Sequence, residues 1–270
     1  MGSVITAAKA MIHRSEEPCI SGTRGSGAIF FSGCVLRCAF CQNSTISHER
    51  FGREITQKRL GEIILSLQDR GVHNINFVSG TQFYPSIIEA VEAVSDSLFI
   101  PVVWNTGGYE KTEAIDALGQ YCSVFLQDVK YFSSDLSRKY SSCSDYCYHA
   151  MKATERMLKV AGDAQFDSEG ILQRGVIIRH LVLPSNRRDS IELLHQLKNA
   201  FGTEGYMLSL MSQYTPPTRD CGFSELGRRI TSFEYNSVCE VALGLGFKGY
   251  FQDRDSAQSA YTPQFDLSGL

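Results

Sequence analysis

The sequence contains no long apolar run, no internal repeat and no linker rich in proline, serine or glycine. Without about 18 consecutive apolar residues it offers no membrane-spanning helix, and its amino-terminal stretch lacks the apolar core of a signal peptide. The net charge of −3, with both signs interspersed, gives no basic surface for nucleic acid or an anionic membrane. These absences predict a globular chain without a nucleic-acid or membrane partner.

Cysteine, in contrast, is plentiful. The nine cysteines are odd in number and are not spaced like the disulfide framework of a small secreted domain, so we expect a reducing, cytoplasmic location. Cys34, Cys38 and Cys41 lie close together, directly after the apolar stretch 25–33, which has glycines at both ends. The three thiols are therefore expected in a loop that leaves a strand.

Three thiolates at this spacing suit an iron–sulfur centre. Cysteine thiolate is the usual ligand of such clusters, and three cysteines can hold three irons of a cubane cluster while the fourth iron stays open. An open metal position marks a reactive site in zinc enzymes, and we extend that rule to iron. Two alternatives remain: chance clustering in a cysteine-rich chain, or a zinc site that His48 completes.

Helices and strands are expected to alternate along the chain. Apolar residues at helical spacing predict helices over 56–70, 84–97, 111–119, 190–201 and 233–245, and a longer helical excursion over 131–170. Apolar runs between turn residues predict strands over 27–32, 74–80, 100–105, 123–129, 176–183, 206–211 and 249–251. Thr56 and Ser232 are expected to cap the first and last of these helices.

This alternation predicts an α/β fold, in which parallel strands wind into a barrel or partial barrel of six β/α units. Residues 1–24 are expected to form a loosely docked lead-in with one or two helical turns at 7–13. Residues 25–270 are expected to form a single domain.

Polar residues gather at the predicted strand ends, where barrel enzymes place their sites. They are Thr81, Gln82, Asn105, Thr106, Asp128, Lys130, Gln213 and Tyr214. Ordinary strand-end turns and a solvated ion pair are the alternatives for Asn105–Thr106 and for Asp128 with Lys130.

Arg179 and His180 interrupt an apolar strand, so one of them must point into the barrel. A charge there needs a partner, which Asp128 or a bound carboxylate would supply. His180, on the other face, is expected to be a buried core histidine.

The spacing Cys34-x-x-x-Cys38-x-Phe40-Cys41 resembles the CxxxCxΦC signature of the radical S-adenosylmethionine (SAM) superfamily. The resemblance implies that the three cysteines hold a [4Fe–4S] cluster and that SAM chelates its open iron. One electron would then cleave SAM to methionine and a 5′-deoxyadenosyl radical, which abstracts a hydrogen atom. Phe40 would pack beside the adenine.

Further motifs look like the group related to pyruvate formate-lyase activating enzymes, often called PflX-like. They are Gly25–Cys34, Cys41-Gln42-Asn43, Asn105-Thr106-x-Gly108-Tyr109-Glu110, Arg179–Pro184 and Met211–Tyr214. The similarity runs from about residue 8 to about residue 250, and implies a partial (β/α)6 TIM-like barrel of the radical SAM type. The cofactor-binding residues it implies or leaves as candidates are Phe40, Thr81, Asn105, Thr106, Asp128, Arg179 and Gln213.

The chain departs from this group at several points. An Asp usually stands in place of Asn105, and a Gly-Gly-Glu sequence in place of residues 79–82, so Thr81 or backbone carbonyls would meet the SAM amine. Relatives often carry an upstream cysteine-rich segment, so the chain is expected to be a short or truncated form. Cys143 and Cys147 would share a helix face. With Cys19 or Cys221 they could bind a second metal, although buried apolar roles are the alternative.

The function implied is activation of a glycyl radical enzyme. The protein would abstract the α-hydrogen of a glycine in a partner protein, with a flavodoxin- or ferredoxin-type electron donor. Radical SAM modification of another peptide or a small molecule is the first alternative, and a non-catalytic cluster- or zinc-binding module is the second.

Overall fold

A ten-stranded sheet carries the fold of the computed structural model, which describes residues 4–217, 221–252 and 263–270. Its spatial order is β10-β9-β8-β6-β5-β4-β2-β1-β3, with β7 paired to β8. The parallel strands are β2 (Ser26–Phe31), β4 (Ile75–Val78), β5 (Val102–Thr106), β6 (Val124–Asp128), β8 (Leu172–Leu181), β9 (Met207–Met211) and β10 (Gly249–Phe251). The antiparallel strands are β1 (Ile5–His13), β3 (Arg53–Ile55) and β7 (Gln165–Phe166).

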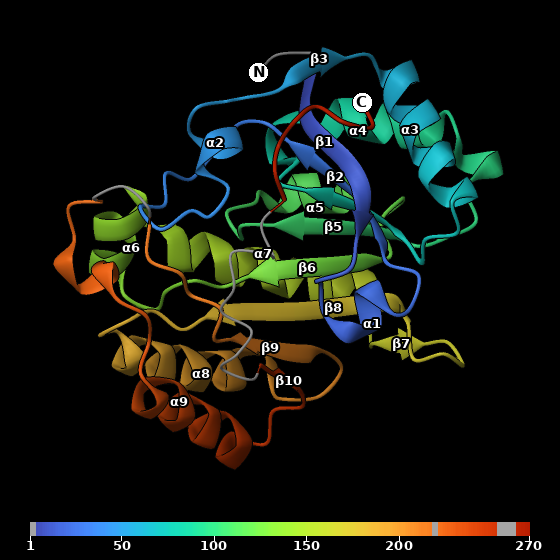
Figure 1. Ribbon diagram of the computed structural model, residues 1–270. Coiled ribbons are helices and arrows are strands. Elements are labelled where there is room, and N and C mark those ends of the chain that lie inside the picture. The colour runs from blue at the N-terminus through green and yellow to red at the C-terminus, as the bar shows by residue number, and fades with distance from the viewer. Residues whose placement is uncertain (1–3, 218–220, 253–262) are drawn as a thin grey trace.

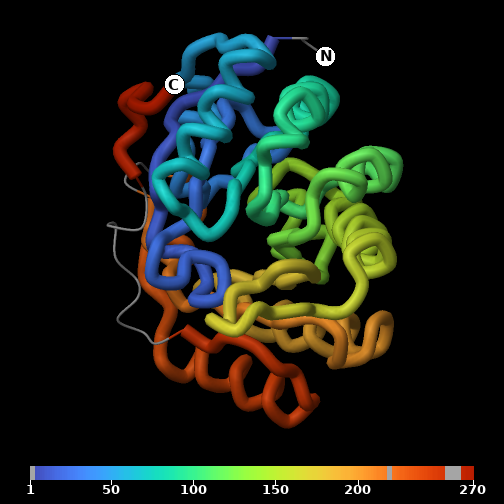
Figure 2. The backbone as a smooth tube through the Cα atoms, turned by 90° about the vertical axis from the view of Figure 1, so that its right-hand side faces the viewer, coloured from blue at the N-terminus to red at the C-terminus, as the bar shows by residue number. Residues whose placement is uncertain are grey.

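Helices cover the outside of this curved sheet (Figures 1 and 2). The longer ones are α3 (Gln57–Asp69), α4 (Tyr84–Glu92), α5 (Thr112–Leu118), α6 (Ser134–Ser141), α7 (Tyr146–Ala161), α8 (Arg187–Phe201) and α9 (Ser232–Leu245). The short ones are α1 (Pro18–Ser21), α2 (Ser44–Ser47) and the 3₁₀ turns η1 (Thr81–Phe83), η2 (Ser95–Ser97) and η3 (Ser224–Gly227). The predicted partial barrel of six β/α units is confirmed.

The strands are apolar because both faces of the sheet are buried. Side chains that point outward pack under the helices, among them Phe31, Phe77 and Trp104. Inward-pointing residues such as Leu126 and Ile177 pack in the barrel interior with Ile20 of α1. The sheet therefore holds the polar residues at its strand ends on a rigid support.

The helix starts were predicted to within a residue or a few. Thr56 caps α3 as expected, because its side chain accepts a hydrogen bond from the backbone N–H of Arg59 at 3.1 Å. The cap of α9 is Thr231, one residue before the expected Ser232, and Glu234 completes a capping box.

The prediction for the amino-terminal segment is wrong. Residues 7–13, expected as helical turns in a loosely docked lead-in, belong to β1, which pairs with both β2 and β3. Its alanines favour a helix in isolation, but they suit the close packing of the sheet, where Ala7, Ala8 and Ala10 are buried. Tertiary pairing thus outweighs local propensity.

The helical excursion predicted over 131–170 consists of the two helices α6 and α7, followed by the short strand β7. α6 ends at Ser141 and α7 begins at Tyr146, so Cys143 lies in the connecting loop. The expectation that Cys143 and Cys147 share a helix face is therefore wrong.

Residues 263–270 lie along β1. The backbone N–H of Leu267 donates to Ala8 at 3.1 Å, and that of Ala10 donates to Ser268 at 3.0 Å. Phe265 packs against Phe30 of β2 with ring centroids 5.5 Å apart.

Among the described residues, no helix combines the length and apolar character that crossing a bilayer requires.

Candidate active site

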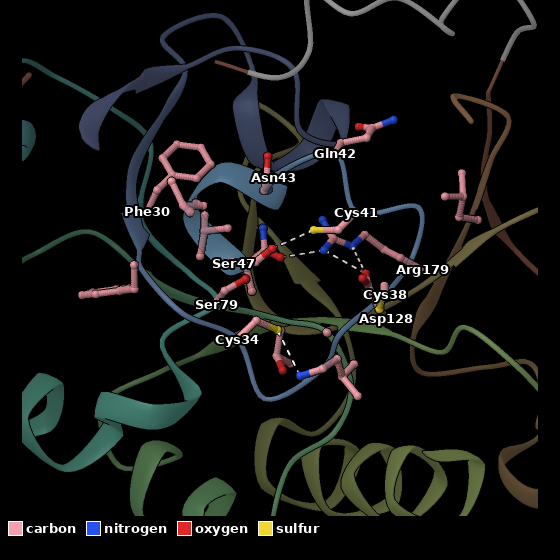
Figure 3. A pocket seen from close by; sticks show the side chains of 18 of the residues that line it. Phe30, Cys34, Cys38, Cys41, Gln42, Asn43, Ser47, Ser79, Asp128 and Arg179 are labelled. Carbon is pink, nitrogen blue, oxygen red and sulfur yellow. Dashed lines mark hydrogen bonds and ion pairs between the residues drawn. The ribbon is translucent and has the colours of Figure 1, made fainter. Parts of the chain in front are cut away.

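A cavity of about 250 Å³ lies at the carboxyl ends of the barrel strands (Figure 3). It is lined by most of the predicted site residues: Cys34, Cys38, Phe40, Cys41, Asn105, Thr106, Asp128, Arg179 and Gln213. Thr81 is the predicted residue that does not line it. Segments far apart in the sequence therefore meet at one cavity, as the strand-end argument predicts.

Each of the three clustered cysteines has a hydrogen-bond partner at its sulfur. The Ser141 hydroxyl of α6 donates to Cys38 at 3.0 Å, and the backbone N–H of Leu36 lies 3.4 Å from Cys34. The Ser47 hydroxyl lies 3.1 Å from the Cys41 sulfur. Hydrogen bonds to the ligand sulfurs tune an iron–sulfur cluster, so these neighbours fit a cluster site.

The thiols are also poorly solvated. Burial raises the pKa of Cys38 to about 12, and burial likewise raises the pKa of Cys34. Coordination to a metal holds a thiol as thiolate, so a bound cluster would reverse this preference.

Within the described ranges, no three His, Cys, Asp or Glu side chains lie close enough to hold one metal ion. This arrangement gives no support to the zinc site with His48. A cubane cluster does not need such a group, because each cysteine binds a different iron. The same finding applies to the second metal considered from the sequence. Among the described residues, no ligand group forms around Cys143, Cys147, Cys19 or Cys221.

Arg179 points into the barrel and is fully engaged there. Its Nε donates to Asp128 at 2.9 Å and its Nη2 donates to Asn105 at 2.6 Å. Its Nη1 donates at 3.2 Å to Glu16, a residue that sequence reasoning missed. Glu16 also accepts from the side-chain amides of Asn76 and Asn105, at 3.2 and 3.1 Å. Of the two partners considered for Arg179, the structure shows Asp128.

Asp128 links this network to Lys130, 2.5 Å away. Both side chains are largely buried, so the solvated ion pair considered from the sequence is excluded. Burial alone would raise the pKa of Asp128, but Arg179 and Lys130 hold it below its usual value. Burial raises the pKa of Glu16 against the opposing effect of Arg179. The cavity therefore has a charged floor with an ionised carboxylate.

Thr81 and Thr106 are both turned toward another carboxyl. Their hydroxyls each donate to Glu110 Oε1 at 2.6 Å, and the indole N–H of Trp104 donates to the same oxygen at 3.2 Å. Glu110 is 3% exposed and is a second residue that the sequence analysis did not assign. In the sequence, Glu110 is marked only by its place at the end of the motif Asn105–Glu110.

Phe40 and Gln213 lie at the cavity wall. The Phe40 ring packs against Tyr131 and Tyr214, each at a centroid distance of 6.3 Å. The backbone carbonyl of Gln213 accepts from the Gln42 side chain at 3.1 Å, which ties the end of β9 to the cysteine loop.

His180 faces away from the cavity, as expected for a core histidine. Its Nδ1 lies 2.7 Å from the Val129 carbonyl and its Nε2 lies 2.9 Å from the Ser190 hydroxyl. Because a carbonyl only accepts, Nδ1 carries the proton and Nε2 accepts from Ser190. Burial lowers the pKa of His180 to about 4.

This burial predicts a loss of stability in mild acid. Between pH 6.5 and about 4 the unfolded chain binds a proton at His180 that the folded chain excludes, so stability falls as pH falls. The total is about 3 kcal/mol at 1.36 kcal/mol per pH unit. Urea unfolding of His180→Asn should show a flatter pH dependence over this range, whereas the exposed His195→Asn should follow the wild type; parallel curves for His180→Asn would contradict the assignment.

The family model for the radical SAM superfamily matches residues 28–199. The chain belongs to this superfamily, whose cofactors are a [4Fe–4S] cluster and SAM. A relative from Methanocaldococcus jannaschii, uncharacterized protein MJ0674, is 29% identical over 226 residues. The match covers 80% of this chain and 62% of that protein, so the chain spans under two thirds of its length.

Among the solved structures that share the fold are SuiB and HydG. SuiB of Streptococcus suis bound to S-adenosylmethionine gives a TM-score of 0.58 at 14% identity, over 82% of this chain and 48% of SuiB. The hydrogenase maturase HydG from Carboxydothermus hydrogenoformans gives 0.52 at 12% identity, over 86% of this chain and 59% of HydG. At these identities the likeness concerns the fold alone.

Proposed function

We propose that this protein is an enzyme that cleaves SAM reductively, with its cluster held by Cys34, Cys38 and Cys41. The observation that carries the proposal is the common cavity. The three cysteines line it together with Asp128 and Arg179, which come from two other strands. Three candidate cluster ligands and two buried charges thus converge at the end of the barrel where such folds place their chemistry.

The remaining residues would bind and orient. When bound, the reduced cluster supplies the electron that cleaves SAM and yields the radical for hydrogen abstraction. Asn105, Asp128 and Arg179 would form the polar floor for the methionyl group of SAM, and Phe40 would pack beside its adenine. Gln213 would contribute to the cavity wall, and Thr81 and Thr106 would bind SAM at the carboxyl ends of β4 and β5. Ser47 and Ser141 would stabilise the thiolates through their hydrogen bonds.

The finer proposal is activation of a glycyl radical enzyme in the cytoplasm. The 5′-deoxyadenosyl radical would take the α-hydrogen of a glycine, giving 5′-deoxyadenosine and a glycyl radical in the partner. A flavodoxin- or ferredoxin-type protein would supply the electron. The support is the set of sequence motifs shared with the PflX-like group, from Gly25–Cys34 to Met211–Tyr214.

The test is anaerobic reconstitution with iron and sulfide, then reduction with SAM and chromatography for 5′-deoxyadenosine. We expect cluster-dependent formation of 5′-deoxyadenosine. A protein that binds only zinc, or a reconstituted cluster that leaves SAM intact, would contradict the proposed activity. A glycyl radical signal on addition of a partner enzyme would support the finer proposal, and hydrogen abstraction from another peptide or a small molecule would replace it.

A further inference from the structure

Glu110 is a buried carboxyl that lies outside the cavity. It accepts hydrogen bonds from Thr106, which lines the cavity, and from Thr81, which stands two residues after the lining residue Ser79. The tight turn at Gly107–Gly108 brings Glu110 back beneath its own strand, next to Trp104 and Thr106 of β5. Gly108 has a φ of +93°, and a Cβ there would lie 2.0 Å from the Asp128 carbonyl oxygen. The turn is therefore possible only with glycine at this position.

The Glu110 carboxyl joins the carboxyl ends of two neighbouring strands, β4 and β5, which we call the β4 exit and the β5 exit. Thr106 ends β5, and Thr81 stands in the η1 turn that follows β4. Both hydroxyls donate to the same oxygen, Oε1, at 2.6 Å. The backbone N–H of Ser79 adds a bond to the Asn105 carbonyl at 2.9 Å. Because Ser79, Asn105 and Thr106 line the cavity, the separation of these exits sets the shape of its wall.

The β4 exit is in turn fixed to the cysteine loop. The side-chain amide of Gln82 donates to the carbonyls of Ser32 and Gly33 at 3.0 and 2.9 Å, and to Ser79 at 3.2 Å. Gly33 directly precedes Cys34, the first of the three clustered cysteines. Hydrogen bonds therefore tie β5, β4 and the loop that carries Cys34 together, with Glu110 at one end and Gln82 in the middle.

We propose that Glu110 is a positioning residue of the SAM site, and that it sets where the exits of β4 and β5 lie relative to the cysteine loop. It does not touch the cavity and acts through Thr81 and Thr106. Its second oxygen, Oε2, is buried without a hydrogen-bond partner among the described residues. Burying a carboxyl oxygen without a hydrogen bond costs free energy, so we expect the carboxyl to serve a purpose that offsets this cost. Holding the segments that follow β4 and β5 together through Thr81 and Thr106 is such a purpose. The inference rests on the proposed function, because it concerns the same SAM site.

The experiment compares Glu110→Ala and Glu110→Gln in the reconstituted enzyme. SAM affinity is measured by equilibrium dialysis, and the electron paramagnetic resonance spectrum of the reduced cluster is recorded with and without SAM. Removing the carboxyl should weaken SAM binding between about tenfold and a hundredfold, the effect of losing one hydrogen bond to a charged group. Iron content and the spectrum without SAM should stay unchanged. Glu110→Gln keeps an oxygen acceptor at the Oε1 position, so it should recover most of the affinity.

Glu234→Ala is the matched control. Glu234 is similarly buried, at 7% exposure, and accepts from the backbone of Ser185 and Thr231 at 2.6 and 2.8 Å, but it does not line the cavity. Its loss should lower thermal stability and leave SAM affinity unchanged. If Glu110→Ala also loses only stability, the carboxyl is merely structural and the inference is overturned.

The role of Glu110 and the proposed cleavage of SAM can fail independently. If Glu110→Ala does not fold, Thr81→Ala removes only the bond to the β4 exit, and unchanged SAM affinity in that variant would overturn the inference. A wild-type protein that binds SAM without cleaving it would contradict the proposed activity, while the comparison of affinities would still decide the role of Glu110. A wild-type protein that binds no SAM would overturn both.

Discussion

Replacing any one of Cys34, Cys38 and Cys41 with alanine is expected to abolish cluster-dependent cleavage of SAM. Each cysteine would hold a separate iron, so one missing thiolate leaves a second iron of the cluster without a protein ligand. The expected loss of 5′-deoxyadenosine formation is at least about a thousandfold, about 4 kcal/mol or more in the activation barrier. The measurement is 5′-deoxyadenosine per chain, with iron content and absorbance of the reconstituted protein.

Cys143→Ala and Cys239→Ala are the controls for these variants. Both thiols are free and partly exposed, and neither lines the cavity. Cys143 donates instead to Asp145 at 3.2 Å. Their alanine variants should retain the cluster and cleave SAM at the wild-type rate. Full activity in any of the three cluster variants would show that the assignment of ligands is wrong.

The cysteine loop and most of the barrel were accessible from the sequence because their signals are local. An apolar run predicts a strand and apolar residues at helical spacing predict a helix, and both patterns involve only neighbouring residues. Parallel strands then bring their carboxyl ends to one edge, so Asn105, Asp128 and Arg179 could be grouped before their distances were known. The prediction of His180 as a core residue followed from the same alternation.

What escaped prediction depends on contacts between distant segments. β1 looked helical because its alanines carry no local sign of the two strands that pair with it. Glu16 stands in a stretch that reads as a turn, and only the folded partial barrel brings it to Arg179, 163 residues away. Glu110 appeared in a motif, but its role depends on Thr81 from another strand exit. Local patterns indicate which side chains are polar, whereas the fold decides which of them meet.

Replacing Arg179, whose guanidinium lies in the charged floor of the cavity, with methionine is expected to lower the free energy of unfolding by about 3–5 kcal/mol. Removing this guanidinium leaves the buried carboxyls of Glu16, Glu17 and Asp128 close to one another, with Lys130, which is paired to Asp128, as a counter-charge. The loss should appear as a lower urea midpoint with an unchanged slope. Arg156→Met is the control, because its ion pair with Asp116 is exposed and should contribute at most about 1 kcal/mol.

The dependence of this loss on pH identifies its cause. Burial raises the pKa of Glu16, and Arg179 opposes that rise; without the arginine the pKa should rise further. A carboxyl with a raised pKa contributes most stability below its unfolded value, near 4.5, and loses that contribution as pH rises through the folded value. The deficit of Arg179→Met should therefore be small in acid and grow toward neutral pH.

Adding Glu16→Gln to Arg179→Met should recover part of the stability at neutral pH and remove part of the pH dependence. The amide carries no charge, so it does not need the lost arginine as a counter-ion, and its side-chain oxygen can still accept from Asn76 or Asn105. The coupling between the two substitutions then measures the buried pair itself. Additive effects in the double variant, or a deficit that does not change with pH, would mean that Arg179 stabilises the barrel through packing rather than through charge.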